Sequence, residues 1–141
     1  VECRVCTNGK AYLMEVSPRA GGNRLAEMLN YAADVNINEA ETKKAVGLQV
    51  VNMHEPNYKG HFAILVLHSE KEGIFQKIEI ETTFREKHVI EEEIRISVGD
   101  KVGSFTGANA ALGTLFLRFD SREELAEALE TQSKWLSIIV S

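Results

Sequence analysis

The chain has 141 residues, of which 44% are hydrophobic and 26% are charged, and its formal net charge is −5. These values are typical of one globular domain with a substantial hydrophobic core. The acidic balance and the lack of a basic tract argue against nucleic acid as the main partner. No apolar run in the sequence approaches the roughly 20 residues of a membrane-spanning helix, and no signal peptide is recognisable, so we expect no membrane partner.

The first predicted element is a β-hairpin over residues 2–16 that turns at Asn8 and Gly9. An Asn-Gly pair between β-prone residues favours a two-residue type I′ turn, which needs positive φ at both positions. This turn places Glu2 directly opposite Glu15, and the alternation of side chains along each strand sorts the hairpin into two faces. The face with the glutamates also carries Arg4, Cys6, Ala11, Leu13 and Ser17, and the other face is the apolar set Val1, Cys3, Val5, Tyr12, Met14 and Val16. We therefore expect the apolar face to belong to a core.

The two facing glutamates are the first candidate site. Like charges directly opposite each other destabilise a sheet, and paired carboxylates either share a proton or hold a cation. Hard cations such as Mg²⁺ take oxygen ligands and are often bound by one or two carboxylates together with substrate phosphates. Glu2 and Glu15 therefore form a candidate Mg²⁺ site. The alternative is two exposed glutamates that water tolerates, with Arg4 as a nearby counter-charge.

A loop over residues 17–23, with the sequence SPRAGGN, follows the hairpin. Pro18 fixes φ and favours an extended residue before it. Gly21 and Gly22 permit unusual backbone angles and the close approach of a ligand, and their amides, with the N-terminus of the next helix, can bind an anion. Arg19 can add a bidentate contact to a phosphate or a carboxylate. The alternative is an ordinary connection from strand to helix with an exposed arginine.

Cys3 and Cys6 form a C-x-x-C pair, which is found in redox sites and in halves of zinc sites. On the predicted strand the two side chains point to opposite faces, and the sequence has no second pair. We therefore interpret Cys3 as a core residue and Cys6 as a small filler. Reduced thiols suit a cytoplasmic location.

Two helices are predicted next. Apolar residues at helical spacing predict the first over residues 23–33. Asn38, with Glu41 three residues later, predicts the N-cap and the capping-box partner of the second, and Gly47 is a natural residue to end it.

The remainder is predicted to be rich in β-strands. Strands over residues 61–68 and 74–84 form a second hairpin, a strand over 88–98 follows, and 98–102 is a tight turn. Glu91, Glu92 and Glu93 favour a solvated face over a metal site. Residues 103–113 form a small-residue connection, 114–119 a strand, and 137–140 a last short strand. Ser121 and Glu124 predict the capping box of a helix between these last two strands. The pattern as a whole predicts an α+β fold, mainly an antiparallel sheet with flanking helices.

Residues 13–22, LMEVSPRAGG, resemble the C-terminal metal-binding hairpin of ATP-grasp enzymes, usually written E-[IV]-N-P-R-x-G-G. The resemblance implies that Glu2 and Glu15 bridge Mg²⁺, or Mn²⁺ in its place, and that Arg19 contacts phosphate or an acyl phosphate. Ser17 stands where the family usually has an asparagine in the metal-ligand set. Gly21 and Gly22 would then contribute to the nucleotide-binding loop. A helix pair ending in Ala-Val-Gly and a Gly-Asp-x-Val turn between late strands are similar to the same family.

The resemblance implies that residues 1–141 form a single C-terminal ATP-grasp fragment. In this division residues 1–47 are the metal hairpin and helix pair, and 48–141 are a β-rich closing region with a C-terminal helix. In the family, ATP phosphorylates a carboxylate, and an amine attacks the acyl phosphate. The small-molecule carboxylate and amine bind largely on N-terminal and central lobes, which we expect to precede this chain in a longer protein. The fragment alone is expected to be inactive, and a homodimeric parent is left open.

Two other interpretations of the sequence stay open. In the first, the chain is a binding or regulatory module that kept the ATP-grasp scaffold without its chemistry. In the second, it is a plain α+β domain in which the glutamate pair is a coincidence. Metal-dependent nucleotide binding by a longer protein separates the ligase from both.

Overall fold

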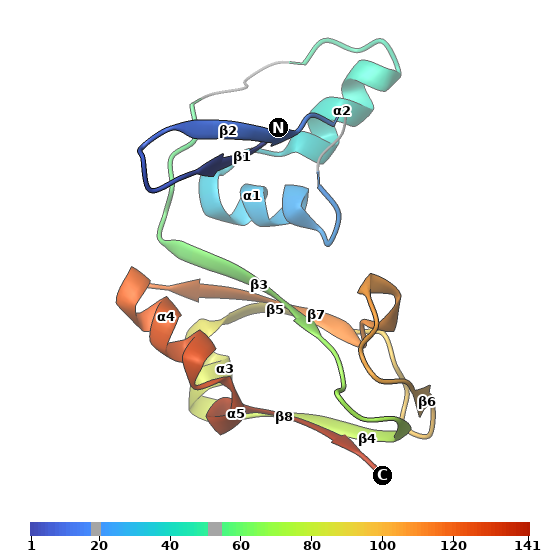
Figure 1. Ribbon diagram of the computed structural model, residues 1–141. Helices are drawn as coiled ribbons and strands as arrows, with labels where there is room; N and C mark the ends of the chain where they lie inside the picture. The colour runs from blue at the N-terminus through green and yellow to red at the C-terminus, as the bar shows by residue number, and fades with distance from the viewer. Residues whose placement is uncertain (18–20, 51–54) are drawn as a thin grey trace.

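The computed structural model describes residues 1–17, 21–50 and 55–141 of the chain (Figure 1). It has a two-stranded hairpin, then a pair of helices, then a β-rich region of two three-stranded antiparallel sheets flanked by helices. The predicted α+β class and the mainly antiparallel pairing are therefore confirmed.

The hairpin consists of β1 (Glu2–Val5) and β2 (Ala11–Glu15), and its loop has three residues instead of the predicted two. The Gly9 N–H donates to the Cys6 carbonyl at 2.9 Å, and the Cys6 N–H donates to the Lys10 carbonyl at 3.0 Å. Gly9 has φ of 75°, whereas Asn8 does not have positive φ. A tight turn followed by a glycine in the left-handed region is the usual three-residue hairpin loop. The predicted type I′ turn is therefore wrong.

Helix α1 (Leu25–Ala33) buries Ala26, Met28, Ala32 and Ala33 on one side. It begins two residues later than predicted because both Asn23 and Arg24 have positive φ. Its predicted end at residue 33 is confirmed, and the next residue leaves the helix with positive φ.

The N-cap of helix α2 (Ile37–Ala45) lies two residues earlier than predicted. The side chain of Asn36, not that of Asn38, accepts the N–H of Glu39 at 3.0 Å. At the other end the Leu48 N–H donates to the Lys43 carbonyl at 2.8 Å, and Gly47 has φ of 75°. This is the hydrogen bond that closes a Schellman motif, so the prediction of Gly47 at the helix end is confirmed.

The β-rich region contains two sheets with strand orders β3-β7-β5 and β6-β4-β8 (Figure 1). Its strands are β3 (His61–Leu67), β4 (Gly73–Ile80), β5 (Val89–Ile94), β6 (Lys101–Val102), β7 (Gly113–Phe119) and β8 (Leu136–Val140). Its helices are α3 (Thr82–His88), α4 (Arg122–Glu130), α5 (Gln132–Trp135) and a 3₁₀ turn (Ala108–Ala110).

The predicted hairpin between the strands at 61 and 74 is wrong. β3 pairs along its whole length with β7, from His61 opposite Phe119 to Leu67 opposite Gly113. β4 pairs instead with β6 and β8 in the other sheet. β3 is nearly continuously apolar, and it lies against a strand that is itself almost entirely buried. The packing of half-buried β3 against buried β7 therefore outweighs the local preference for a hairpin, which the sequence pattern alone favours.

The strand predicted over residues 74–84 ends at Ile80, and α3 takes its place beyond that point. The carboxylate of Glu81 accepts the N–H groups of Thr83 and Phe84 at 2.9 and 2.6 Å. These backbone hydrogen bonds lower the pKa of Glu81, because they favour its ionised form. Glutamate is not among the preferred N-cap residues, which explains why no helix start was predicted here.

The core of the β-rich region lies between the sheets and the C-terminal helices. Its most deeply buried side chains are Leu67, Leu115, Leu117 and Phe119, whereas the equally buried Phe116 faces α1. Trp135 stacks on Phe84 with ring centroids 3.8 Å apart and donates its indole N–H to the Ala128 carbonyl at 2.8 Å. The predicted cap of α4 is confirmed, because the Glu124 N–H donates to Ser121 Oγ at 3.0 Å. Across the described ranges, no helix has the length and apolar character to cross a membrane.

Candidate functional site

The predicted pairing of the two hairpin glutamates is present in the structure: Glu2 lies opposite Glu15. The register that produces it differs from the predicted one. The three-residue loop shifts the pairing by one residue, so that Cys3 lies opposite Leu13. An irregularity between Glu2 and Cys3 then leaves Met14 as an extra residue and returns Glu15 to its place opposite Glu2. The prediction was correct because these two departures offset each other.

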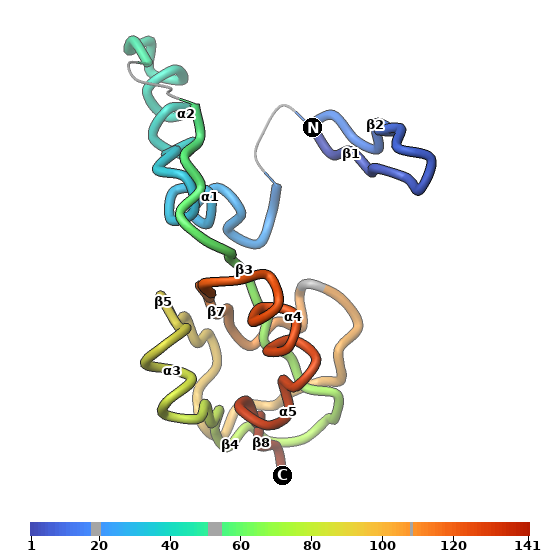
Figure 2. The backbone as a smooth tube through the Cα atoms, turned by 90° about the vertical axis from the view of Figure 1, so that its left-hand side faces the viewer, coloured from blue at the N-terminus to red at the C-terminus, as the bar shows by residue number. Residues whose placement is uncertain are grey.

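The predicted sorting of the hairpin into two faces is wrong for the same reason. Arg4 lies opposite Tyr12, and Cys3 opposite Leu13, so each of these pairs joins residues from both predicted sets. The apolar side chains are also exposed instead of being in a core, for example Val5 at 72%. Cys3 and Cys6 are both exposed free thiols, which corrects their interpretation as a core residue and a filler. Figure 2 shows the hairpin apart from the β-rich region, with its faces uncovered by that region.

The glutamate pair has the donor chemistry of a Mg²⁺ site. Among the residues that the structure describes, neither Glu2 nor Glu15 forms an ion pair, and Arg4 pairs with neither. Both carboxylates are exposed, so their oxygens are accessible to a cation. The described residues contain no group of three or more His, Cys, Asp or Glu side chains suited to a metal. The pair would therefore need other oxygens, such as those of phosphates and water, to complete the coordination of a hard cation.

The loop after the hairpin is described in part. Pro18, Arg19 and Ala20 lie outside the described residues, so the role of Arg19 stays a prediction. Ser17 is half-buried at the end of the hairpin.

The glycine pair does not have the unusual backbone angles that were predicted for it. Neither Gly21 nor Gly22 has φ in the left-handed region. A Cβ atom on Gly21 would lie 3.0 Å from Cδ2 of Leu25, which is a tight contact with the end of an exposed side chain. A Cβ atom on Gly22 would meet nothing within 4 Å.

The unusual angles lie at the next two residues, where Asn23 has φ of 54° and Arg24 has φ of 61°. The N–H groups of Gly21 and Gly22 donate to no acceptor within the described residues. These two N–H groups are thus accessible to an anion, and the binding of phosphate by them stays a prediction.

Arg24 is the centre of a polar cluster that the sequence did not reveal. Its Nη2 lies 2.6 Å from Oε1 of Glu91, and its Nη1 lies 3.0 Å from Oε2 of Glu93. Its Nε donates to Glu27, one turn further along α1. The plane of the guanidinium covers the ring of Phe116, with Cζ 4.6 Å from the centroid. Arg24 therefore joins the start of α1 to both β5 and β7.

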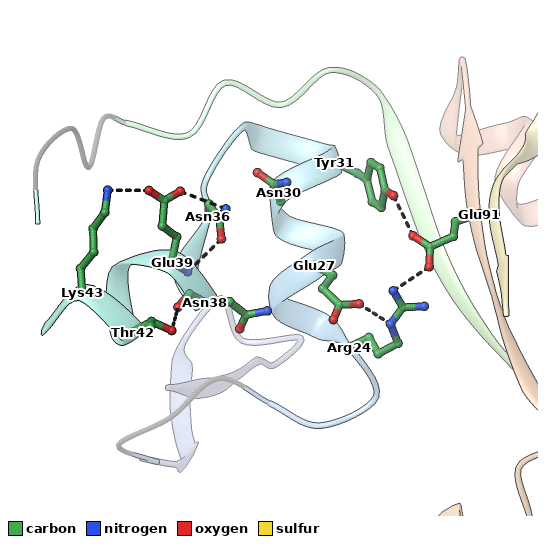
Figure 3. A pocket seen from close by; sticks show the side chains of 10 residues that line it. All are labelled: Arg24, Glu27, Asn30, Tyr31, Asn36, Asn38, Glu39, Thr42, Lys43 and Glu91. Carbon is green, nitrogen blue, oxygen red and sulfur yellow. Dashed lines mark hydrogen bonds and ion pairs between the residues drawn. The ribbon is translucent and has the colours of Figure 1, made fainter. Parts of the chain in front are cut away.

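Tyr31 completes this cluster from the same side of α1, about two turns later (Figure 3). Its hydroxyl donates to Oε2 of Glu91 at 2.7 Å, and its ring packs edge-to-face on Phe116 at 5.7 Å. This hydrogen bond lowers the pKa of Glu91, with Arg24 adding to the effect against partial burial. The same bond raises the pKa of Tyr31. Burial opposes the charge of Arg24, but hydrogen bonds to Glu91 and Glu27 raise its pKa above the ordinary arginine value.

The interpretation of residues 91–93 as a solvated face is therefore wrong, because all three glutamates are half-buried and ion-paired. Glu91 and Glu93 lie on β5 and bind Arg24, whereas Glu92 binds Arg85. Alternation along a strand would have placed Glu91 and Glu93 on one face and Glu92 on the other. This alternation indicated that Glu91 and Glu93 could bind the same cationic side chain. It could not identify that side chain as Arg24, which is distant in the sequence.

A polar groove of about 760 Å³ lies beside this cluster, between α1, α2 and β5 (Figure 3). Its lining includes the amide side chains of Asn30, Asn36 and Asn38. Lys43 pairs with Glu39 across one turn of α2, and Arg24 pairs with Glu27 and Glu91. Within the described lining every charged side chain therefore already has a partner of opposite charge.

Solved structures similar to this chain include two enzymes. No family model matches the chain, and no curated protein matches it. The L-amino acid ligase from Bacillus licheniformis is 18% identical, with a TM-score of 0.78 over 99% of this chain and 35% of that enzyme. The phosphoribosylglycinamide synthetase from Anaerococcus prevotii is 16% identical, with a TM-score of 0.74 over 96% of this chain and 35% of that enzyme. The chain thus spans about 35% of the length of either enzyme.

Proposed function

We propose a function for this chain from its ATP-grasp fold. The chain shares this fold with the C-terminal part of both enzymes, so the fold resemblance predicted from its sequence is confirmed. The proposal is that the chain is the C-terminal portion of an ATP-dependent ligase. That ligase joins a carboxylate to an amine through an acyl phosphate. The observation that carries the proposal is the register of the hairpin, which sets Glu2 opposite Glu15.

In this proposal Glu2 and Glu15 hold Mg²⁺, or Mn²⁺ in its place, on the phosphates of ATP. The cation would supply neutralisation of the phosphate oxygens, which is a main electrostatic task in phosphoryl transfer. The exposure of both carboxylates and their lack of ion pairs among the described residues support this assignment. Ser17 is proposed as a further oxygen ligand from the end of the same hairpin.

The loop would bind the phosphate side of the nucleotide. The N–H groups of Gly21 and Gly22, which have no acceptor in the described part of the chain, are available to phosphate oxygens. Arg19 is proposed to steady the transferred phosphoryl group, since a guanidinium binds phosphate oxygens in a bidentate manner.

The remaining features of the ligase are also proposals. The small-molecule carboxylate and amine would bind largely on lobes outside this chain, and neither nucleic acid nor a membrane is required. We expect a cytoplasmic location, and the homodimeric parent stays an open proposal. By itself the 141-residue chain is expected to be catalytically silent, and ATP turnover by it would contradict this.

Nucleotide binding by a longer protein that contains this chain tests the proposal. We expect a non-hydrolysable ATP analogue to bind in the presence of Mg²⁺, measured by isothermal titration calorimetry, and binding to weaken at least tenfold in Glu2→Gln and in Glu15→Gln. Glu41→Gln, an exposed position on α2, is the matched control and should bind normally. Equal binding by all of these proteins would show that the hairpin carboxylates do not bind the metal. Capture of a partner without nucleotide would favour the binding or regulatory module.

A further inference from the structure

The backbone at the start of α1 is strained at Arg24. Asn23 and Arg24 are consecutive residues with φ of 54° and 61°. Asparagine visits this left-handed region readily, whereas arginine does so rarely. Such a conformation persists only when the surrounding structure determines it strongly. The side chain of Arg24 must therefore gain enough from its contacts to hold its own backbone in this state.

The contacts of Arg24 use every part of the guanidinium. Nη2 and Nη1 bind Glu91 and Glu93 on β5 at 2.6 and 3.0 Å, and Nε binds Glu27. One face lies on Phe116, a β7 residue that is fully buried.

Glu91 is itself fixed, because Tyr31 donates a hydrogen bond to it at 2.7 Å. Tyr31 packs on the same ring of Phe116. Helix α1, β5 and β7 are thus joined in a closed set of contacts.

These contacts anchor the chain at one point, immediately after Gly21, Gly22 and Asn23. The Leu25 N–H donates to the Gly22 carbonyl at 3.3 Å, so the turn that carries the glycines is also closed at this point. The N–H edges of Arg24 already face three carboxylates. Its side chain is therefore suited to holding the loop in place and not to binding a phosphate itself.

We propose that Arg24 is a positioning residue, which is held by Glu91 and thereby keeps Gly21 and Gly22 in the orientation needed for phosphoryl transfer. This inference rests on the proposed ligase function. It assigns to the Arg24, Tyr31, Glu91 and Glu93 cluster the task of fixing the loop end, whereas the hairpin carboxylates would hold the cation.

The first test uses hydrogen exchange in the 141-residue chain, followed by NMR. We expect the amides of Leu25 and Glu27, which donate to the carbonyls of Gly22 and Arg24, to exchange at least tenfold faster in Arg24→Gly, which relieves the backbone strain but removes the anchor. Glu91→Gln keeps an acceptor for Tyr31 and removes the charge that Arg24 binds, so it should have the same effect. Arg85→Gln is the matched control, because it removes the ion pair of the neighbouring Glu92 and leaves Arg24 untouched. Unchanged exchange in both anchor variants, or equal acceleration in the control, would overturn the proposal.

The second test separates positioning from general stability by steady-state kinetics in the longer protein. Because the metal carboxylates lie on the hairpin, Arg24→Gly should lower kcat at least tenfold and leave KM for ATP within about twofold. Arg24→Lys keeps the charge without the planar fork and should recover part of kcat. A raised KM with unchanged kcat would overturn the positioning role alone. Failure of the unsubstituted protein to form ADP would instead overturn the proposed function together with this inference.

Discussion

At Gly113 the backbone of β5 leaves no space for a side chain. A Cβ atom there would lie 2.3 Å from the Glu93 carbonyl oxygen and 3.2 Å from Cα of Ile94. Because both contacts are with backbone, the strand itself would have to move. We predict that Gly113→Ala lowers the free energy of unfolding by about 2–3 kcal/mol, in the range of overpacked core substitutions.

Denaturant unfolding measures this loss. Gly103→Ala is the control, since a Cβ atom at that glycine would meet nothing within 4 Å and its φ is not in the left-handed region. Equal midpoints for Gly113→Ala and the unsubstituted chain would contradict the close approach of β5 and β7.

The Tyr31–Glu91 hydrogen bond predicts how stability depends on pH. It lowers the pKa of Glu91, so its contribution is present above the ordinary value of 4.5 and is lost as the pH falls through the lower folded-state value. It also raises the pKa of Tyr31, so the contribution is present below the ordinary value of 10.0 and is lost as the pH rises through the higher folded-state value. The bond therefore stabilises the chain between these two limits.

We predict that Tyr31→Phe destabilises the chain by about 1 kcal/mol near neutral pH, as for a single hydrogen bond to a charged group at a partly exposed site. The difference from the unsubstituted chain should shrink below about pH 4 and above about pH 10. Urea unfolding across this range measures it. A difference that does not vary with pH would mean that the hydroxyl and the carboxylate are not coupled.

At the scale of elements, the hairpin loop depends on Gly9. Its φ of 75° is left-handed, and a Cβ atom there would meet nothing within 4 Å, so only the backbone conformation selects glycine. Gly9→Ala should destabilise the hairpin by about 1 kcal/mol, whereas Gly9→Asn should cost less because asparagine tolerates this region. Hydrogen exchange at the Cys6 N–H, which binds the Lys10 carbonyl, reports the loss as roughly fivefold faster exchange. Identical rates in Ala and Asn variants would contradict the observed turn.

Elements with a complete local signal were predictable. β7 and β8 were recognised from their apolar runs, and the cap of α4 from Ser121 and Glu124. The features that failed depend on other parts of the chain. α3 begins after a glutamate that is not a usual N-cap, and β3 pairs with β7, a buried strand some fifty residues later.

The candidate site divides in the same way. The facing of Glu2 and Glu15 was predictable from their spacing around the turn, although the loop and the irregularity that produce it were not. The Arg24 cluster joins residues that are far apart in sequence, and no motif marks it. Its strained backbone is visible only in three dimensions.

At the scale of the whole molecule, the hairpin is exposed along its whole length, because every residue from 1 to 16 is exposed. Leu13 is 61% exposed and Val1 is 84% exposed, although both are large apolar residues. The only cysteines in the sequence, Cys3 and Cys6, are exposed on the same hairpin, so their reactivity reports on this element alone.

We predict that both thiols of the native 141-residue chain react with Ellman's reagent at a rate close to that in denaturant. The expected stoichiometry is that of the two cysteines in the sequence. Single Cys3→Ser and Cys6→Ser variants assign the two signals. Thiols that become reactive only on unfolding would show that the hairpin packs on the rest of the chain.

The central claim is that the hairpin carboxylates serve an ATP-dependent ligase. Its most direct test is ADP release by the longer protein with Mg²⁺, against mixed carboxylates and amines, in the unsubstituted, Glu15→Gln and Glu41→Gln forms. We predict that release needs both substrates, falls about a hundredfold or more in Glu15→Gln and is retained in Glu41→Gln. Absence of ADP release together with absence of Mg-ATP binding would contradict the claim and leave the hairpin as the scaffold of a binding module.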